Sequence, residues 1–283
     1  MIAKNILLKI VTATCRHAVG PALLSMLASF VVGVPMASAD DPKAREIMQA
    51  VNDRDDGDNQ VSDMLMILVD RRGNERKRNI RSYSKDFGED THSIMFFLSP
   101  ADVKDTGFLT FDYDESGKDD DQWLFLPALR KTKRIASSDK SGSFMGSDFN
   151  FSDMTERDLD DYEYKIMKEV EVDGVMTWQI ESKPRNDDVA DETGYSKAVI
   201  FVRQDNYVVI RVVNWVYKSR KRKYMKINKL EKIDGIWVAT DMQMVTKEGR
   251  QTVHSTFLKF NNIKFNQDLD DSVFTVRTLE KGL

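Results

Sequence analysis

Side chains able to support catalysis are few in this sequence and lie far apart. From residue 40 onward there are two histidines, His92 and His254, each on a stretch that alternates like a β-strand. The motifs of serine hydrolases (GxSxG), zinc peptidases (HExxH), thiol oxidoreductases (CxxC), P-loops and dinucleotide-binding folds (GxGxxG) are absent. Because no nucleophile, base and orienting group can be assembled, we expect no enzymatic activity and no cofactor.

One acidic stretch comes close to a calcium-binding loop. Residues 112–123 (DYDESGKDDDQW) place Asp112, Asp114 and Ser116 at the first three ligand positions of an EF-hand loop. The last position, which requires a bidentate glutamate, holds Trp123, and no flanking helix is expected. We therefore predict a hydrated hairpin turn and no metal site.

A second unusual stretch, residues 137–154 (SSDKSGSFMGSDFNFSDM), is rich in apolar side chains but has neither a helical nor a strand period. Glycine, serine and aspartate break it into a loop, so its large apolar groups need another apolar surface to cover. The apolar residues are Phe144, Met145, Phe149, Phe151 and Met154, and the glycines are Gly142 and Gly146.

The first 39 residues have the features of a secretory signal peptide. Their charged side chains are Lys4, Lys9 and Arg16, and an apolar run over residues 22–36 precedes a small-residue cleavage sequence at 37–39. We predict that residues 1–39 are removed on export and that the protein is periplasmic. An uncleaved membrane anchor is the alternative.

The expected mature chain, residues 40–283, must be stabilised by its core alone. Cleavage removes the one cysteine, Cys15, so disulfides and thiol chemistry are not available. The remaining 39 basic and 46 acidic residues give a net charge of −7. This balance favours solubility and argues against a nucleic-acid partner.

Hydrophobic periodicity indicates one helix followed by an antiparallel sheet. Residues 41–53 carry apolar positions at helical spacing after an aspartate and a proline suited to begin a helix. About a dozen strand-like stretches follow, ending with a short one at 273–276 and separated by turn pairs such as Asp173–Gly174. We predict a mainly β fold, one domain over residues 40–283, in which an antiparallel meander curls on itself.

A sheet of this length must place large side chains on its inner face. These side chains either pack the interior or line a cavity, and the 11 methionines from residue 40 onward favour a cavity because methionine adapts to variable apolar ligands. The predicted lining consists of Trp123, Phe125, Trp178, Phe201, Met242 and Met244.

Basic residues recur in short runs along the strands. Arg130, Lys133 and Arg134 form one run, and they are candidates for contacts with anionic lipid headgroups or an acidic partner. The alternative is that such runs are the solvated faces of strands.

Two neighbouring segments carry a resemblance to a known family. Residues 123–135 (WLFLPALRKTKRI), followed by residues 142–154 (GSFMGSDFNFSDM), resemble the periplasmic outer-membrane lipoprotein-sorting proteins related to LolA and LolB. The similarity is to the branch associated with RND/MMPL-type transporters and extends over most of the predicted mature chain. It implies an incomplete antiparallel β-barrel, a LolA-like half-barrel, wrapped over a few short helices, with a hydrophobic cavity that holds acyl chains.

Together these observations predict a periplasmic carrier that binds the acyl chains of a lipid or lipoprotein and passes it between envelope components, with an RND/MMPL-type transporter as partner. Phe144, Met145, Phe149 and Phe151 would form a lid over the cavity. A loop packed permanently into the core is the alternative for this segment. For the whole protein, the alternative is a non-transporting accessory subunit of an envelope transporter complex.

Overall fold

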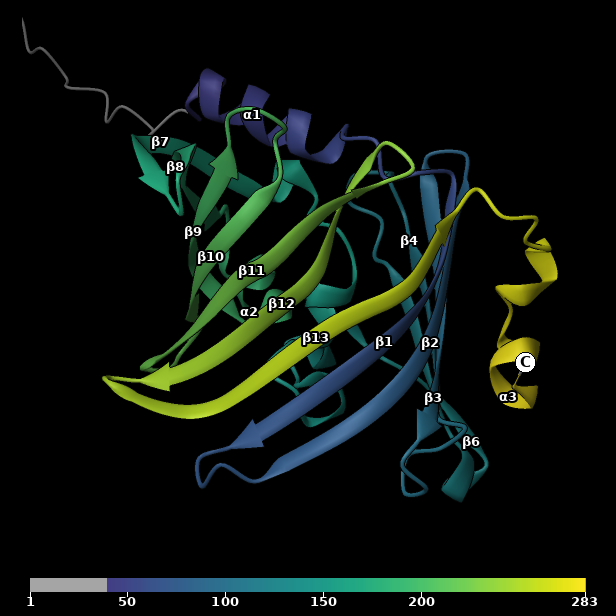
Figure 1. Cartoon of the computed structure of the whole chain (residues 1–283). Coiled ribbons are helices and arrows are strands. Elements are labelled where there is room, and N and C mark those ends of the chain that lie inside the picture. Colours follow the sequence, from purple (N-terminus) through teal and green to yellow (C-terminus); the bar gives the residue numbers. More distant parts are fainter. Residues whose placement is uncertain (1–39, 283) are drawn as a thin grey trace, which may run out of the picture. The chain divides into compact units, whose positions relative to one another are not determined.

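The computed structural model describes residues 40–282. Within them, a single 13-stranded antiparallel sheet forms, with the strand order β6-β5-β4-β3-β2-β1-β13-β12-β11-β10-β9-β8-β7. The sheet curls without closing, so the predicted incomplete barrel is confirmed (Figure 1). The predicted signal peptide, residues 1–39, lies outside the described residues.

The strands are long and joined mostly by short turns. Their bounds are β1 Asn59–Asp70, β2 Glu75–Phe87, β3 Asp90–Ser99, β4 Gly107–Asp112, β5 Asp121–Leu126, β6 Lys131–Arg134, β7 Tyr162–Val172, β8 Val175–Pro184, β9 Tyr195–Arg203, β10 Val209–Val216, β11 Lys221–Ile233, β12 Ile236–Glu248 and β13 Gln251–Phe265. The helices are α1 Pro42–Asn52, α2 Asp187–Thr193 and α3 Val276–Lys281, and short 3-10 turns include η1 Pro127–Leu129, η3 Phe144–Gly146 and η4 Phe151–Met154. None of the helices in residues 40–282 is long and apolar enough to cross a bilayer.

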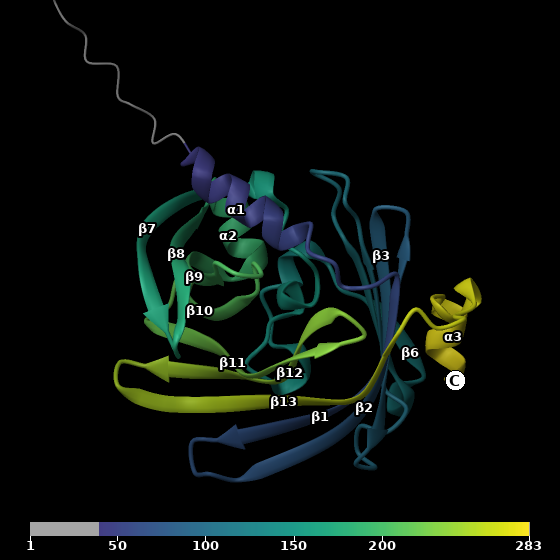
Figure 2. The same ribbon diagram turned by 45° about the horizontal axis from the view of Figure 1, so that its top comes forward.

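Two meanders build the sheet, and the pairing of β1 with β13 joins them. The chain runs outward from β1 to the edge strand β6, crosses the interior through residues 135–161, and starts again at the other edge strand, β7. Figures 1 and 2 both show the short turns of this crossing segment inside the curve of the sheet, together with α2, which follows later in the chain. The crossing segment is therefore the part of the chain that fills the half-barrel.

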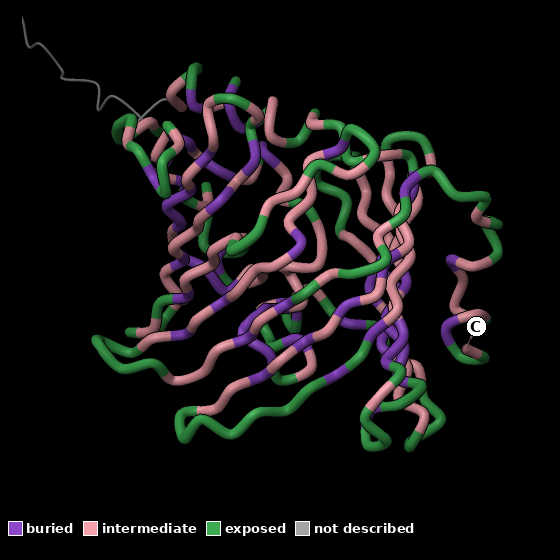
Figure 3. Tube along the Cα trace, viewed as in Figure 1, coloured by how far each residue is buried: buried purple, intermediate pink, exposed green. Residues whose placement is uncertain are grey.

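Strand alternation assigns side chains to the two faces. On β1, Met64, Met66 and Leu68 are buried, whereas the residues between them are half-buried. Figure 3 shows this alternation of buried and intermediate positions along many of the strands. The face to which Met66 belongs is called the inner face below, because the crossing segment packs against it.

Helix α1 closes the end of the interior beside β7. Asp41 caps it by accepting the backbone N–H of Lys43 at 3.0 Å, and Pro42 occupies the first turn. Ile47 and Met48 pack with Tyr164 of β7 and with inward-facing residues of β8 and β9. The predicted helix at residues 41–53 is thus present in the structure.

The C-terminal segment differs from its sequence-based prediction. Residues 273–276 were expected as a strand, but the chain instead makes a 3-10 turn at Asp271–Val273 and then α3. The Thr275 hydroxyl caps α3 by accepting the Thr278 backbone N–H at 3.2 Å. Leu279, one turn later, is fully buried on the outer face of the sheet, so tertiary packing overrides the local strand preference.

Candidate functional site

The inner face of the sheet is the candidate site, and residues 142–154 fill part of it. Phe144 is 1% exposed and Phe149 is 6% exposed. The ring centroid of Phe144 lies 5.0 Å from that of Phe108 on β4 and 5.6 Å from that of Phe151. These loop aromatics join a cluster built from β1–β5, β12 and β13. The loop therefore packs its unusual apolar residues into the half-barrel.

Polar side chains of the sheet hold the backbone of this loop. The Arg78 guanidinium donates to the carbonyl oxygen of Met145 at 2.6 Å, and the Gln122 amide donates to that of Phe151 at 3.0 Å. Both donors are buried, so each bond satisfies groups that water does not reach. Within the loop, the Phe144 N–H donates to the Phe149 carbonyl at 2.8 Å.

Asp148 connects the loop to β12 and β13. Its side chain is buried and accepts the hydroxyl hydrogens of Thr246 on β12 and of Thr256 on β13, the latter at 2.7 Å. His254 Nδ1 lies 2.7 Å from the same carboxylate. The Asp148 backbone N–H in turn donates to the Thr256 hydroxyl at 2.9 Å. A buried carboxylate is stable here because three side chains of the sheet lie within hydrogen-bond distance of it.

The second half of the loop is tied to β9, β11 and α2. Lys223 Nζ donates to the Asn150 side-chain oxygen at 2.6 Å, and the Asn150 amide donates to the carbonyl of Thr193 at 2.9 Å. The Tyr195 hydroxyl donates to Asp153 at 2.7 Å. Burial lowers the pKa of Lys223 and raises the pKa of Tyr195 well above its ordinary value.

Five partly buried methionines, two of them in the loop itself, pack against the cluster that the loop joins. These side chains pack against the same cluster as Phe144 but keep some contact with solvent, unlike the fully covered Met66. Thioether side chains can rearrange around different apolar shapes, which suits a surface that exchanges one apolar group for another. The five methionines are Met95, Met145, Met154, Met225 and Met242.

The structure divides the predicted lining among different clusters. Met242 and Met244 pack in the same cluster as Phe144 and Phe149. Trp123 and Phe125 instead pack on the outer face, beside α3. They flank Leu124, which faces inward, and side chains of a strand alternate between faces.

The other two predicted lining residues also lie away from the loop cluster. Phe201 packs with Val172 and Ile210, whereas its neighbour Val202 faces inward with α1. Trp178 belongs to the α1 cluster, and its ring stacks at 5.7 Å on that of Tyr207. These six residues therefore do not form one continuous lining. Residue type alone does not show which face of the sheet a strand residue occupies.

The predicted basic contacts lie at the β6 edge of the sheet. Lys133 pairs with Asp139 at 2.8 Å, and Arg134 forms an ion pair with Asp121. Arg130 follows η1 in a left-handed backbone conformation, with φ 48°, and is exposed. Of the three, Arg130 has no ion-pair partner among residues 40–282, so the run is partly neutralised by its surroundings.

Residues 112–120 of the acidic stretch line a polar pocket of about 310 Å³ between α1, the β4–β5 turn and residues 155–162. Burial, and then the nearby Asp120, raises the pKa of Asp112 to about 7. The Asp112 carboxylate accepts the backbone N–H of Glu156 at 2.7 Å, just beyond the loop. Among the described residues, no group of three or more acidic, histidine or cysteine side chains is arranged to hold a metal ion.

Sequence reasoning missed the polar residues that hold the loop. Nothing in the sequence connects His254, Arg78 or Lys223 with residues 142–154. Their partners are distant in sequence, 106 residues away for the pair His254–Asp148. The one available signal was Asp148 itself, an acidic residue within an apolar loop.

Comparisons with known proteins place these features in a family. A protein-family model described as an uncharacterized protein matches residues 89–281. A DUF1329 family protein from Desulfovibrio piger is 30% identical, with a TM-score of 0.77, over 86% of this chain and 100% of that one. The chain belongs to the DUF1329 family. A search of curated protein sequences found no match.

Two further solved structures connect this DUF1329 protein with lipoprotein-sorting proteins. A candidate outer membrane lipoprotein-sorting protein domain from Vibrio parahaemolyticus is 29% identical, with a TM-score of 0.76, over 84% of this chain and 99% of that one. A LolA superfamily protein from Nitrosomonas europaea is 18% identical, with a TM-score of 0.61, over 83% and 98%, which shows the shared fold. The predicted resemblance to the LolA-like family is confirmed.

Proposed function

We propose that this DUF1329 protein is a periplasmic carrier that binds the acyl chains of a lipid or lipoprotein against the inner face of its sheet. The observation that carries the proposal is that a loop, rather than a second sheet, occupies the open half-barrel. Phe144, Phe149 and Phe151 lie where an acyl chain would find an apolar surface. The relative from Vibrio parahaemolyticus, named for lipoprotein sorting, supports the same class of cargo.

Exchange of the loop for cargo is energetically reasonable. An acyl chain that buries about ten methylenes gains roughly 8 kcal/mol, at about 0.8 kcal/mol each. Displacing two phenylalanine side chains from the interior returns about 4 kcal/mol of that gain. Separating Asp148 from Thr246, Thr256 and His254 adds a further cost, although water can solvate the released carboxylate. The small net gain would allow release to an acceptor.

Cellular location and partner belong to the same proposal. The signal-peptide features of residues 1–39 support export to the periplasm. An inner-membrane RND/MMPL-type transporter is the proposed partner, supported by the sequence resemblance described above. In this arrangement the protein would move a lipid or acylated lipoprotein between the transporter and another envelope component.

A second candidate function is a non-transporting accessory subunit of an envelope complex. The observation that favours it is the strength with which the loop is held: Phe144 is 1% exposed, and Arg78 and Asp148 are buried and bonded. A permanently filled interior would leave the sheet as a docking platform. The two functions differ in whether residues 142–154 leave the inner face.

The decisive experiment combines lipid analysis with amide exchange. The protein is isolated from its periplasm without detergent and its extract is analysed for acyl lipids by mass spectrometry. Hydrogen exchange of residues 142–154 is then compared with and without added phospholipid, using the water-soluble glycerophosphate headgroup as a control without acyl chains. A carrier should copurify with lipid and lose protection at the Phe144 amide when lipid is added. Absence of lipid together with unchanged exchange would favour the accessory subunit.

A further inference from the structure

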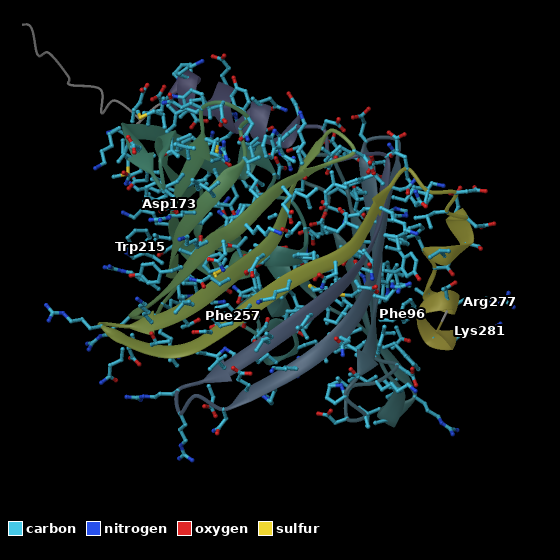
Figure 4. All side chains as sticks on the ribbon, in the orientation of Figure 1. Phe96, Asp173, Trp215, Phe257, Arg277 and Lys281 are labelled. Atoms are coloured by element: carbon cyan, nitrogen blue, oxygen red, sulfur yellow. The ribbon has the colours of Figure 1, made fainter. Side chains whose placement is uncertain are left out.

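The outer face of the sheet carries a second apolar feature, separate from the loop. A groove of about 870 Å³ lies where α3 ends against β2, β3 and β5. Tyr83, Phe96 and Phe125 line it with aromatic surface, and Leu98 and Pro127 complete its apolar part. Figure 4 shows Phe96 on the side of the sheet that faces α3, with Lys281 at the end of the helix. Helix α3 therefore covers only part of this apolar strip.

Two leucines at this groove are unusually open to solvent. Leu98, which lines it, is 47% exposed, and Leu129, which lies between the lining residues Pro127 and Arg130, is 63% exposed. Isolated exposed leucines are ordinary on protein surfaces. Here they adjoin a groove with an aromatic floor, and a contiguous apolar area of that kind is typical of an interaction surface.

Basic side chains that form no ion pair within residues 40–282 lie in and near the same groove. Arg130 and Lys281 line the groove. Lys104 and Lys131 are adjacent in sequence to lining residues, and Arg277 lies on α3. None of these five cations forms an ion pair within residues 40–282, whereas the adjacent Lys133 and Arg134 do. Two carboxylates line the groove, those of Asp105 and Glu280. Glu280 accepts a hydrogen bond from Thr132 at 2.6 Å.

This local charge opposes that of the whole protein. Residues 40–283 have a net charge of −7, so an anionic surface would repel the molecule as a whole and attract this region. Unpaired cations beside exposed leucines are suited to bind a surface that offers both anionic groups and apolar groups. An anionic bilayer offers phosphate groups at its surface and acyl chains just below, whereas an acidic protein patch offers the charge alone.

We propose that the groove beside α3, together with Leu98 and Leu129, is a docking site for anionic phospholipid bilayers. Arg130 and Lys281 contact the phosphate groups, and the two leucines enter the headgroup–acyl boundary. Helix α3 and β6 lie on the same side of the molecule in Figures 1 and 2, so this face can approach a membrane while the inner face stays free. The docking site is independent of whether the inner face carries lipid.

Vesicle flotation tests the proposal directly. The protein, as its host processes it, is mixed with vesicles of phosphatidylcholine alone or with added phosphatidylglycerol. We expect binding to the anionic vesicles only, weakening as salt is raised. The double variant Arg130→Glu/Lys281→Glu should bind at least roughly 30-fold more weakly, since the loss of each basic residue near the surface weakens binding by about fivefold.

Matched controls separate this site from general electrostatics. Lys165→Glu/Arg250→Glu makes the same charge change at exposed positions on β7 and the β12–β13 turn and should leave vesicle binding nearly unchanged. Leu98→Ser/Leu129→Ser should weaken binding about tenfold and leave the salt dependence in place. Thermal unfolding of each variant verifies that the fold is retained.

Several outcomes would overturn the proposal. Equal binding to both vesicle types, or an equal loss in the control variant, would show that the groove is not the docking site. Binding to monomeric lysophosphatidylglycerol but not to vesicles would assign the groove to a single lipid molecule. Absence of vesicle binding combined with binding to an acidic protein would assign it to a protein partner.

Discussion

Two segments cover opposite faces of the same sheet, and they do so by different means. Residues 142–154 cover the inner face with aromatic side chains and with buried hydrogen bonds from Arg78, Gln122 and the residues around Asp148. Helix α3 covers the outer face with Leu279 and neighbouring apolar side chains. Among the described residues, the polar side-chain contact of α3 with the sheet is the exposed hydrogen bond that Thr132 donates to Glu280.

The two covers are expected to open differently, because one is held mainly by apolar contacts and the other also by buried hydrogen bonds. Apolar contacts are lost gradually as a helix frays, and the exposed groups regain water without an unmet polar partner. A buried polar network is closer to all-or-none, because removing one partner leaves the others without water. The loop should therefore leave its site as a unit and α3 by local unfolding. The predictions below test that contrast.

The largest effect is expected for Phe144→Ala. Truncating this fully buried ring should lower the free energy of unfolding by about 3–5 kcal/mol, measured by urea denaturation. Phe151→Ala, at a partly exposed position of the same loop, is the matched control and should cost roughly 1–2 kcal/mol. Equal, small costs for both would mean that the loop spends much of its time away from the sheet.

Asp148→Ala should have the next largest effect. The substitution leaves Thr246, Thr256 and His254 without their common acceptor, at a cost of about 3 kcal/mol. Amide exchange should at the same time show loss of protection across residues 142–154. Asp119→Ala, which removes one exposed bond to Ser137, serves as control and should change stability by less than about 0.5 kcal/mol. Loss of stability without faster loop exchange would contradict the network as the anchor of the loop.

The apolar cover can be tested at Gly107 on β4. A β-carbon added at this glycine would lie 2.6 Å from Leu279 Cδ1, so α3 can approach the sheet closely only because residue 107 has no side chain. Gly107→Ala should cost about 1–3 kcal/mol and expose α3 to limited proteolysis.

The combination Gly107→Ala/Leu279→Val controls for the origin of this effect. Shortening the side chain of Leu279 removes the predicted clash, so the double variant should be less destabilised than the sum of the single variants. If the loss of stability in the double variant equalled the sum of the two single losses, the destabilisation by Gly107→Ala would arise within β4 and not from contact with Leu279. Neither variant should alter the exchange of residues 142–154, since that loop lies on the other face.

The sequence predicted the architecture well because periodicity and turn pairs are local signals. The helix at residues 41–53, the antiparallel meander and its incomplete closure are all present in the structure. The strand expected at residues 273–276 was wrong, because burial of Leu279 against β3 and β4 stabilises a helix there. Local preference was therefore reliable where the sheet repeats and unreliable at its end.

The site was harder to predict because it depends on which face each strand residue occupies. Trp123 and Phe125 were assigned to the interior by size, yet the residue between them, Leu124, faces inward. The anchors of the loop were also out of reach, since Asp148 meets partners from β12 and β13 about a hundred residues later. Residue type indicated that the loop needs an apolar surface but not which polar groups hold it there.

The smallest effect concerns Asp112, which accepts the Glu156 backbone N–H where the chain leaves the loop. Burial, followed by repulsion from Asp120, raises the pKa of Asp112 to about 7, above its ordinary value of 3.8. The folded state therefore retains a proton that the unfolded state releases. This contribution to stability is complete below about pH 4 and is lost as the pH rises through 7.

Asp112→Asn removes this titration and keeps an oxygen that can accept the Glu156 N–H. We expect the variant to be more stable than the unmodified protein by about 1–2 kcal/mol at pH 8 and nearly equal near pH 4, measured by urea denaturation at each pH. Asp114→Asn, two residues away and exposed, is the control and should show no such pH-dependent difference. An equal difference in the free energy of unfolding at pH 8 and pH 4 would contradict destabilisation by burial of the Asp112 carboxylate. The contrast between the loop and α3 would then depend on Asp148 alone.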